Sequence, residues 1–483
     1  MSTPGSPPAR GVWQLALAQA LAVLVAATAA VLYARWLQPA QLAGWLLALG
    51  VARAGVVLLD GGLKTALVRR DGLPDSASLR RLQRQATALA LSAAVLVCLV
   101  AAVLATSGRI DSGQAWLLAV CPAAYFCCQP PLPLALARLE RAGCFGTVGR
   151  AEGSALLLEF ALPALLLAAG LAPAAACGLA VVLARLLRTG WIVAAARALP
   201  APAAAGPAAG MPLWRDGASV QAVAGLSMLR DQMHLWLLAP WFGAAWAGLY
   251  SLAGTACALA SQAAVQTAAR VALPGLRMLA DAARWQAMLR QTRLLAIACL
   301  PPLLLLPAWL AWADAQLWAG TWAQALPLLP WMLLRMVAGM ALTTLGVGLL
   351  LAPDHWTAAR THAAWTALEI MLAVLALALW GPIGLAMAGA LGGWVGLLLC
   401  LRAATPAATP WWPRLPPLLA ALLLRPSLAL AALLAAWVQQ QPQALGAATL
   451  ALPLCWLAEP AVRRALRARW PGLAAAAGME PLP

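Results

Sequence analysis

Charged residues are scarce in this chain of 483 residues, and acidic residues are the scarcest of them. Asp, Glu, Lys and Arg make up 10% of the sequence, with 15 acidic residues against 32 basic ones. Hydrophobic residues make up 64%. Soluble domains carry about a quarter of charged residues on average. The composition therefore excludes an ordinary soluble protein.

Recognisable enzyme motifs are also lacking. The sequence has no G-x-x-x-x-G-K-[ST] phosphate loop, no H-E-x-x-H and no G-x-S-x-G. Its three histidines and ten cysteines show no zinc-binding spacing, and most of the cysteines lie in apolar runs, as small buried hydrophobic residues do. We therefore expect no enzymatic activity, no metal and no other cofactor.

The basic residues fall mainly in alternate connectors between long apolar runs. The net charge is +17, which in a soluble protein would suggest a nucleic-acid partner. Here 24 of the 32 basic residues fall in every second connector, six fall inside apolar runs, and only Arg35 and Arg109 fall in the other connectors. Connectors rich in Lys and Arg stay in the cytoplasm. The asymmetry thus predicts the membrane orientation, and it explains the charge without nucleic acid.

About fourteen apolar stretches are long enough to cross a bilayer as helices of about 20 residues. They lie near 13–35, 41–60, 85–106, 115–137, 151–170, 173–196, 217–238, 244–269, 293–312, 323–351, 361–380, 382–401, 415–437 and 443–459. Connectors on the side poor in basic residues are short, as at Gly381–Pro382. An even number of spans places both termini in the cytoplasm. The sequence therefore predicts an all-α, multi-pass membrane protein embedded in the lipid bilayer.

Two pairs of charged residues indicate an internal repeat. Arg150 and Glu159 lie nine positions apart in the fifth stretch, and Arg360 and Glu369 show the same spacing in the eleventh, 210 positions later. Six helices per repeat give both halves the same orientation, with a central site between two bundles. We predict an N-lobe of helices 1–6, a C-lobe of helices 7–12, and a third part that holds helices 13–14 and a basic cytoplasmic tail. Their boundaries are 1–200, 201–405 and 406–483.

Six arginines fall inside the apolar stretches, where charge is costly and usually functional. They are Arg53, Arg185, Arg188, Arg230, Arg335 and Arg425. Arg53 shares a helix face with Asp60, seven residues later, so it forms either a structural ion pair or an anion site that faces the cavity. Arg185 and Arg188 lie near the cytoplasmic end of their stretch, where we expect them to reach towards the interface. Arg425 precedes a proline, which predicts a structural kink.

The seventh stretch holds several polar groups, more than packing requires. Arg230 shares a face with His234, four residues on, and Asp231 is rotated by about 100°. We expect these residues at a central cavity, with Arg335 of the tenth stretch as a further cation. The eighth stretch carries a polar stripe, which lines a wet cavity or holds helices together. The stripe consists of Ser251, Thr255, Gln262 and Gln266.

Carboxylates inside the membrane are candidates for binding a coupling ion, either H⁺ or Na⁺. These candidates are Asp60, Asp231, Glu159 and Glu369. Glu159 and Glu369 occupy equivalent places in the two repeats. For these two we favour structural hydrogen bonding within each bundle, since coupling sites are often unique to one half.

Three segments resemble a known family in the order in which they occur. The run ARWLQPAQLAGWLLALGVARAGVVLLDGGLKTALVRRDGLPD resembles the amino-terminal signature of Wzx-type flippases, the polysaccharide transporters of the multidrug/oligosaccharidyl-lipid/polysaccharide (MOP) exporter superfamily. RDQMHLWLLAPWFGAAWAGLYSLA is similar to their hairpin of helices seven and eight, and LGVGLLLAPDHWTAARTHAAWTALEI to their passage from helix ten to helix eleven. The resemblance covers most of 13–402.

This resemblance implies two six-helix lobes that alternate access across a bacterial inner membrane, with two extra C-terminal helices packed outside. The implied substrate is an undecaprenyl-diphosphate-linked oligosaccharide for lipopolysaccharide or exopolysaccharide biosynthesis. Polysaccharide polymerase or assembly proteins are the expected partners. A diphosphate cannot cross hydrocarbon without counter-charge, which Arg53 and Arg230 would supply. His234, Arg335 and Gln262 complete the expected cavity.

Three other functions stay open. A drug/cation antiporter of the same superfamily would place carboxylates at the cavity centre, where this sequence places arginines. A flippase for the peptidoglycan lipid precursor uses similar arginines. A membrane glycosyltransferase or ligase should have a long outer loop with acidic residues or histidines, and this sequence shows none.

Overall fold

The computed structural model of the chain is a bundle of helices. It describes residues 36–60, 62–64, 67, 76–200, 213–277, 279–351, 355–405, 409–423, 425–460 and 462–464. Every regular element in these ranges is a helix, so the all-α prediction is confirmed. The first predicted span, 13–35, lies outside the described residues.

The helices of the N-lobe cover the second to sixth predicted spans. They are α2 (Pro39–Asp60), α4 (Ser76–Thr106), α5 (Ser112–Cys128), α6 (Leu132–Arg141), α7 (Phe145–Ala168) and α8 (Pro173–Arg197). Local signals set several of their ends. The Asp111 carboxylate accepts a hydrogen bond from the Gln114 amide at 2.7 Å and so caps α5. Pro173 stands in the first turn of α8, where a missing N–H costs nothing.

The next helices along the chain form the C-lobe, and three of them are long. They are α9 (Leu213–Phe242), α10 (Ala244–Arg277), α11 (Asp281–Leu317), the 3₁₀ segment η1 (Ala323–Leu328), α12 (Leu329–Leu350) and α13 (His355–Ala403). The chain then continues through η2 (Trp412–Arg414), α14 (Leu415–Leu423), α15 (Pro426–Gln440), η3 (Pro442–Ala444), α16 (Leu445–Leu450) and α17 (Leu452–Leu457).

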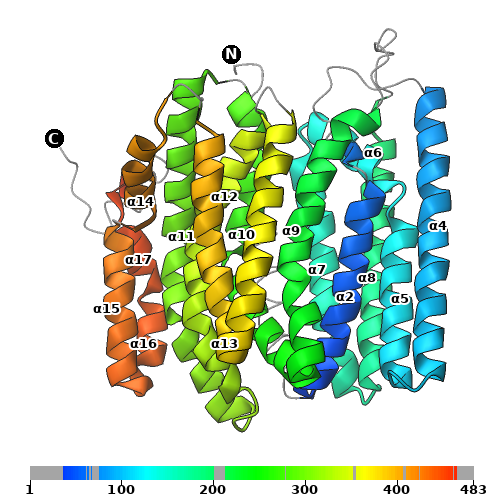
Figure 1. Cartoon of the computed structure of the whole chain (residues 1–483), viewed down its shortest axis with the longest axis horizontal. Coiled ribbons are helices and arrows are strands. Elements are labelled where there is room, and N and C mark those ends of the chain that lie inside the picture. Colours follow the sequence, from blue (N-terminus) through cyan, green and yellow to red (C-terminus); the bar gives the residue numbers. More distant parts are fainter. Residues whose placement is uncertain are drawn as a thin grey trace.

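Helix α2 lies between α9 of the C-lobe and α5 of the N-lobe (Figure 1). It packs against α5 on one side and against α9 and α10 on the other. Its Trp45 and Leu49 side chains are fully buried in a core that both lobes share. Helix α4 lies at one edge of the bundle, and α14 to α17 lie at the opposite edge, where they pack on α11. A side chain on α2 can therefore reach both lobes.

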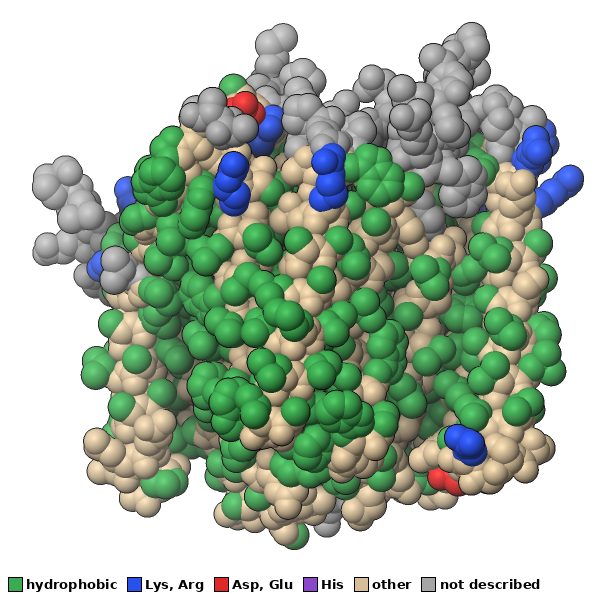
Figure 2. Space-filling model, in the orientation of Figure 1, with side chains coloured by type: hydrophobic (Ala, Val, Ile, Leu, Met, Phe, Trp, Pro, Cys, Tyr) green, Lys and Arg blue, Asp and Glu red, His purple; other side chains and the backbone are tan. Residues whose placement is uncertain are grey.

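Polar and apolar surfaces are separated along the helix direction. Hydrophobic side chains cover the flank of the bundle, and Lys and Arg side chains gather at one end on the face that Figure 2 shows. One basic side chain lies near the other end. In the described residues, seven helices are long and apolar enough to cross a membrane, or nine if each of two bent helix pairs forms one span. Helices α9 and α10, of 30 and 34 residues, run beside them.

Glycine and proline set the breaks between spans. Gly243, with φ of +87°, separates α9 from α10, and Gly381, with φ of +61° and ψ of −149°, divides α13 into the two predicted spans 361–380 and 382–401. The predicted kink before Pro426 is confirmed, since α14 and α15 are bent there by 50°. Proline has no N–H to continue the helical ladder.

Two further predicted spans are also broken. The stretch 115–137 is broken into α5 and α6, which are bent by 50° where Pro130 and Pro131 follow α5. The last predicted span, 443–459, consists of short helices instead, because Pro453 follows a break at Ala451. Helices α16 and α17 together measure about 20 Å at 1.5 Å per residue, which is shorter than a hydrocarbon core of about 30 Å.

Candidate functional site

Two cavities lie in the middle of the bundle, one on each side of α2. The first, which we call the N-lobe cavity, has a volume of about 600 Å³ and is lined by α2, α5, α6, α7, α8 and part of α9. The second, the C-lobe cavity, has a volume of about 370 Å³ and is lined by α2, α9, α10 and α12. Arg53 of α2 lines both. These are sizes at which proteins bind small molecules, about 300–1,000 Å³.

The N-lobe cavity is lined by more basic than acidic side chains. Its charged lining residues are Arg53, Lys64, Arg185, Arg188, Asp60 and Glu152. Just behind the lining, the Glu159 carboxylate of α7 is completely buried. Its oxygens contact Arg53 Nη2 at 3.5 Å and Arg185 Nη2, and they accept a hydrogen bond from the Tyr125 hydroxyl at 3.2 Å. One carboxylate thus holds two guanidinium groups at the cavity wall.

Arg53 and Arg185 differ in how far they are enclosed. The Arg185 guanidinium lies 4.0 Å from the centre of the Tyr125 ring, and its side chain is 13% exposed. The Arg53 side chain is 45% exposed although it contacts Glu159. A guanidinium group has five N–H donors, so an exposed arginine that contacts a carboxylate can also donate to an anion.

The expectation that Arg185 and Arg188 reach the interface is wrong. Both point inward, Arg185 to Glu159 and Arg188 to Glu152, with an Nη2–Oε1 distance of 3.2 Å for the second pair. A buried carboxylate leaves a large desolvation cost unless a cation contacts it. The pairing therefore holds these arginines inside the bundle.

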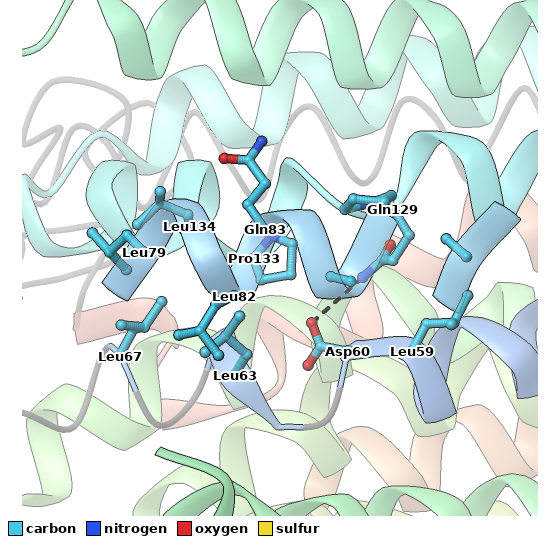
Figure 3. A pocket seen from close by; sticks show the side chains of 13 residues that line it. Leu59, Asp60, Leu63, Leu67, Leu79, Leu82, Gln83, Gln129, Pro133 and Leu134 are labelled. Atoms are coloured by element: carbon cyan, nitrogen blue, oxygen red, sulfur yellow. Dashed lines mark hydrogen bonds between the residues drawn. The ribbon is translucent and has the colours of Figure 1, made fainter. Parts of the chain in front are cut away.

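The spacing of Arg53 and Asp60 allowed a structural ion pair between them, but the contacts that the structure describes do not include this pair. In the described residues Arg53 contacts Glu159, while Asp60 accepts a hydrogen bond from the Gln129 amide at 3.4 Å (Figure 3). The same carboxylate borders a small pocket whose other walls are mostly leucines, among them Leu63 and Leu82. Asp60 therefore stands between a polar cavity and an apolar recess.

A second buried glutamate organises the C-lobe. The Glu369 carboxylate of α13 is completely buried and contacts Arg335 Nη2 at 3.2 Å and Arg230 Nε at 3.8 Å. Arg335 also lies 3.6 Å from Asp231, whose side chain is 67% exposed in the C-lobe cavity. Arg335 is therefore part of a charged network and not an isolated cation.

Arg230 is buried beneath the cavity wall. Its side chain is 4% exposed, donates to the Thr366 hydroxyl at 2.6 Å and the Ser227 hydroxyl at 3.1 Å, and lies over the Trp365 ring at 3.6 Å. It is not among the described residues that line the two cavities. The expectation that Arg230 faces a cavity is therefore not met, because its guanidinium is bound by partners on α13 and by Ser227 on its own helix.

His234 lies where the sequence placed it, at a cavity. Its ring is stacked on Tyr250 with 4.9 Å between the ring centres and 23° between the planes, and its Nε2 lies 3.0 Å from the Ser251 hydroxyl. All three residues line the C-lobe cavity together with Thr255. The side chain of Gln262 lies outside the described residues, as does that of Gln266.

These contacts follow the spacing of the predicted repeat. Glu159 and Glu369 are separated by 210 positions, and so are two side chains that touch them, Tyr125 of α5 and Arg335 of α12. Sequence reasoning missed Tyr125 and Tyr250. Tyr125 could have been found from the sequence, because it lies 210 positions before Arg335, which is the offset of the predicted repeat.

Comparison with known proteins decides the family. A sequence profile described as "Polysaccharide biosynthesis protein" matches residues 32–325, more than half of the chain. The chain belongs to this polysaccharide biosynthesis protein family. The match confirms the resemblance that the sequence motifs indicated, and the described residues form the helical, multi-pass architecture that this resemblance implies. No curated protein sequence matches this family member.

Solved structures support the fold of this family member. The structure "Lipid II flippase MurJ, inward closed conformation" matches with a TM-score of 0.64 and 10% identity, over 92% of this chain and 97% of that chain. A MATE transporter structure, of the P26A mutant, matches with a TM-score of 0.53 and 14% identity, over 87% of this chain and 99% of that one. At such low identity the likeness shows a shared transporter fold and nothing about the substrate.

Proposed function

We propose that this protein is a flippase that moves an undecaprenyl-diphosphate-linked oligosaccharide across the inner membrane by alternating access between its lobes. The observation that carries the proposal is the position of Arg53 between the two cavities. Its guanidinium is anchored by a buried carboxylate, remains 45% exposed, and borders both central cavities. The polysaccharide biosynthesis family supports a saccharide substrate.

The charge of the N-lobe cavity suits a diphosphate. Transfer of an isolated anion from water into a medium of low dielectric constant costs tens of kcal/mol by an idealised estimate. Guanidinium groups offset that cost by charge and by paired N–H donors that match phosphate oxygens. Arg53, Arg185 and Arg188 lie on the walls of one cavity, and each has a carboxylate partner that fixes its position. A bound diphosphate would place its negative charge next to these three guanidinium groups.

Ion coupling, if the transport cycle uses it, fits Asp60 and Asp231 better than the two buried glutamates. Glu159 and Glu369 each contact two arginines, so a further cation would meet strong repulsion. Asp231 is 67% exposed in its cavity, and Asp60 borders the other. A carboxylate that faces a wet cavity can exchange H⁺ or Na⁺ with solvent.

The proposed orientation follows from the basic end of the bundle. Positive residues remain in the cytoplasm, so the end that carries most of the Lys and Arg, and both termini with it, would face the cytoplasm. The transported unit would then reach a polysaccharide polymerase or assembly protein on the outer side, in lipopolysaccharide or exopolysaccharide synthesis.

The test is translocation by the purified protein in lipid vesicles. The substrate is the lipid-linked saccharide that accumulates in the producing strain after deletion of the gene. Its arrival on the far leaflet is measured with an impermeant glycosidase. We expect Arg53→Ala to slow translocation by at least about tenfold, the effect of losing one charge-assisted hydrogen bond. Arg290→Ala, which removes an exposed arginine outside both cavities, should match the wild type. Equal rates for both variants would contradict the proposal.

A flippase for the peptidoglycan lipid precursor is the second candidate, because the MurJ structure shares the fold over almost the whole chain. The same vesicles separate the two functions when peptidoglycan lipid precursor is supplied in a parallel assay. Rapid transfer of that precursor, with no transfer of the accumulated saccharide lipid, would favour the second function. A cation antiporter is disfavoured because Arg53 and Arg335 occupy the cavity walls.

A further inference from the structure

The two cavities offer different chemistry, although Arg53 joins them. The N-lobe cavity presents cations: Arg185 and Arg188 add to Arg53 on its walls. The C-lobe cavity presents an imidazole, hydroxyl groups, an amide and the exposed carboxylate of Asp231, and its further cation, Arg335, is paired with Asp231 and Glu369. A substrate that carries a diphosphate at one end and hydroxyl groups at the other would meet matching chemistry on the two sides of α2.

His234 and Tyr250 form a rigid aromatic wall in the C-lobe cavity. The two rings are stacked at 4.9 Å, and the Ser251 hydroxyl, 3.0 Å from His234 Nε2, fixes the imidazole. The face of an aromatic ring is electron-rich. The C–H groups on one face of a pyranose carry a slight positive charge, so they pack well on such a wall.

Asp231 adds an acceptor that suits sugar hydroxyls and disfavours phosphate. Its carboxylate is 67% exposed in the cavity and is held 3.6 Å from Arg335. An ionised carboxylate only accepts hydrogen bonds, and it can take two hydroxyl donors at once. The same charge offsets that of Arg335, so this cavity attracts a diphosphate less than the N-lobe cavity, which Arg53, Arg185 and Arg188 line. The carboxylate therefore favours one orientation of the substrate, with the phosphates towards α8 and the saccharide towards α10.

Open space lies beside this wall. Gly254 of α10 lines the C-lobe cavity, and a Cβ added there would meet no described atom within 4 Å. The cavity of about 370 Å³ is therefore not filled by side chains next to Gly254 on its α10 side.

We propose that the C-lobe cavity is the saccharide subsite of the flippase, in which His234, Tyr250 and Asp231 recognise the sugar next to the diphosphate while Arg53 holds the diphosphate at the junction of the cavities. This inference rests on the proposed function and adds which part of the substrate each lobe binds. It assigns the choice of sugar to α9 and α10.

The experiment measures how much the saccharide contributes to binding. Two probes are used with the full-length protein in nanodiscs: undecaprenyl diphosphate, and the saccharide-bearing lipid from the deletion strain. For the wild type, the saccharide lipid should bind with the lower Kd. In His234→Ala and Asp231→Asn this advantage should fall by about tenfold, because a stacking surface or a charged acceptor is lost. In Arg53→Ala the Kd of both probes should rise together.

A variant that fills the C-lobe cavity with a large side chain distinguishes loss of the subsite from loss of folding. Gly254→Phe should exclude the saccharide lipid and still bind undecaprenyl diphosphate. Its control is Gly190→Phe, at an exposed glycine of α8 whose added Cβ also meets no described atom within 4 Å. This control should bind both probes as the wild type does.

The outcomes separate this inference from the proposed function. A wild type that binds both probes with equal Kd, or His234 and Gly254 variants that keep the full saccharide advantage, would overturn the subsite and leave the flippase intact. A wild type that binds neither probe and transfers no saccharide lipid in vesicles would overturn the proposed function, and the subsite with it.

Discussion

Tyr125 and Arg335 hold corresponding places in the two lobes, and each contacts the buried glutamate of its own lobe. The Tyr125 hydroxyl lies 3.2 Å from Glu159, and Arg335 Nη2 lies 3.2 Å from Glu369. At the offset of 210 positions the carboxylate is the same in both lobes, whereas its partner is a neutral hydroxyl in one and a cation in the other. Each lobe still supplies its glutamate with two arginines, but from different helices, so the charge at the two cavities differs.

Removal of the Tyr125 hydroxyl should weaken the N-lobe. We expect Tyr125→Phe to lower the free energy of unfolding by about 1.5–3 kcal/mol, the usual contribution of a hydrogen bond to a charged group. Tyr125→Leu should cost more, because it also removes the ring under Arg185. Thermal unfolding in detergent measures both effects. Equal melting temperatures for the two variants would show that the ring contact with Arg185 contributes nothing.

Arg230 and Arg53 should respond differently to the same substitution. Arg230→Ala leaves Glu369 completely buried with one cation fewer, and breaking a buried pair costs about 3–5 kcal/mol. We expect less folded protein in the membrane. Arg53→Ala should lose transport and keep a near-normal amount of protein, because its side chain is 45% exposed and Glu159 retains Arg185. Size-exclusion profiles of the two variants, set beside their transport rates, test this. Equal losses of folded protein would contradict the distinction.

Two glycines control the approach of α2 to the C-lobe at its two ends. A Cβ at Gly248 would collide with the backbone of Pro39, and a Cβ at Gly62 would collide with the backbone of Gly217. We expect Gly248→Val to separate the end of α2 that begins at Pro39, and Gly62→Val to separate the opposite end. The two variants should therefore bias alternating access in opposite directions.

Accessibility of a cavity residue measures this bias. Thr255→Cys, in a cysteine-free background, places a thiol in the C-lobe cavity. An impermeant thiol reagent is added to one side of the membrane or the other. With Gly248→Val, labelling should increase from the outer side, and with Gly62→Val from the cytoplasmic side. Gly190→Val serves as the control. The same labelling pattern in both glycine variants would refute the prediction.

Gly381 should tolerate no side chain. Its φ of +61° and ψ of −149° lie in a region that is open almost only to glycine. Gly381→Ala should therefore cost about 1–3 kcal/mol of stability. Gly446→Ala, at a helical glycine with open space around it, should be neutral or slightly stabilising. Melting temperatures of the two variants give the comparison, and a neutral Gly381→Ala would mean that the kink adjusts without strain.

The sequence alone determined the features that depend on one helix at a time. Long apolar stretches predicted the spans, glycine and proline predicted breaks such as Gly381 and Pro426, and connectors with arginine predicted the orientation. The spacing of Arg150 and Glu159, found again at Arg360 and Glu369, indicated the repeat. These signals are local or periodic, so they can be read without knowledge of which helices meet.

Only the tertiary structure decided which charges meet. The spacing left open whether Arg53 pairs with Asp60 on its own helix or faces a cavity as an anion site, and the structure shows it in contact with Glu159 on α7. Arg185 was expected at the interface, but it lies inside the bundle because it also contacts the buried Glu159. A charge in a membrane selects the partner that best offsets its desolvation, and that partner often stands on a helix distant in sequence. Spacing along one helix shows which side chains share a face, whereas packing decides what that face touches.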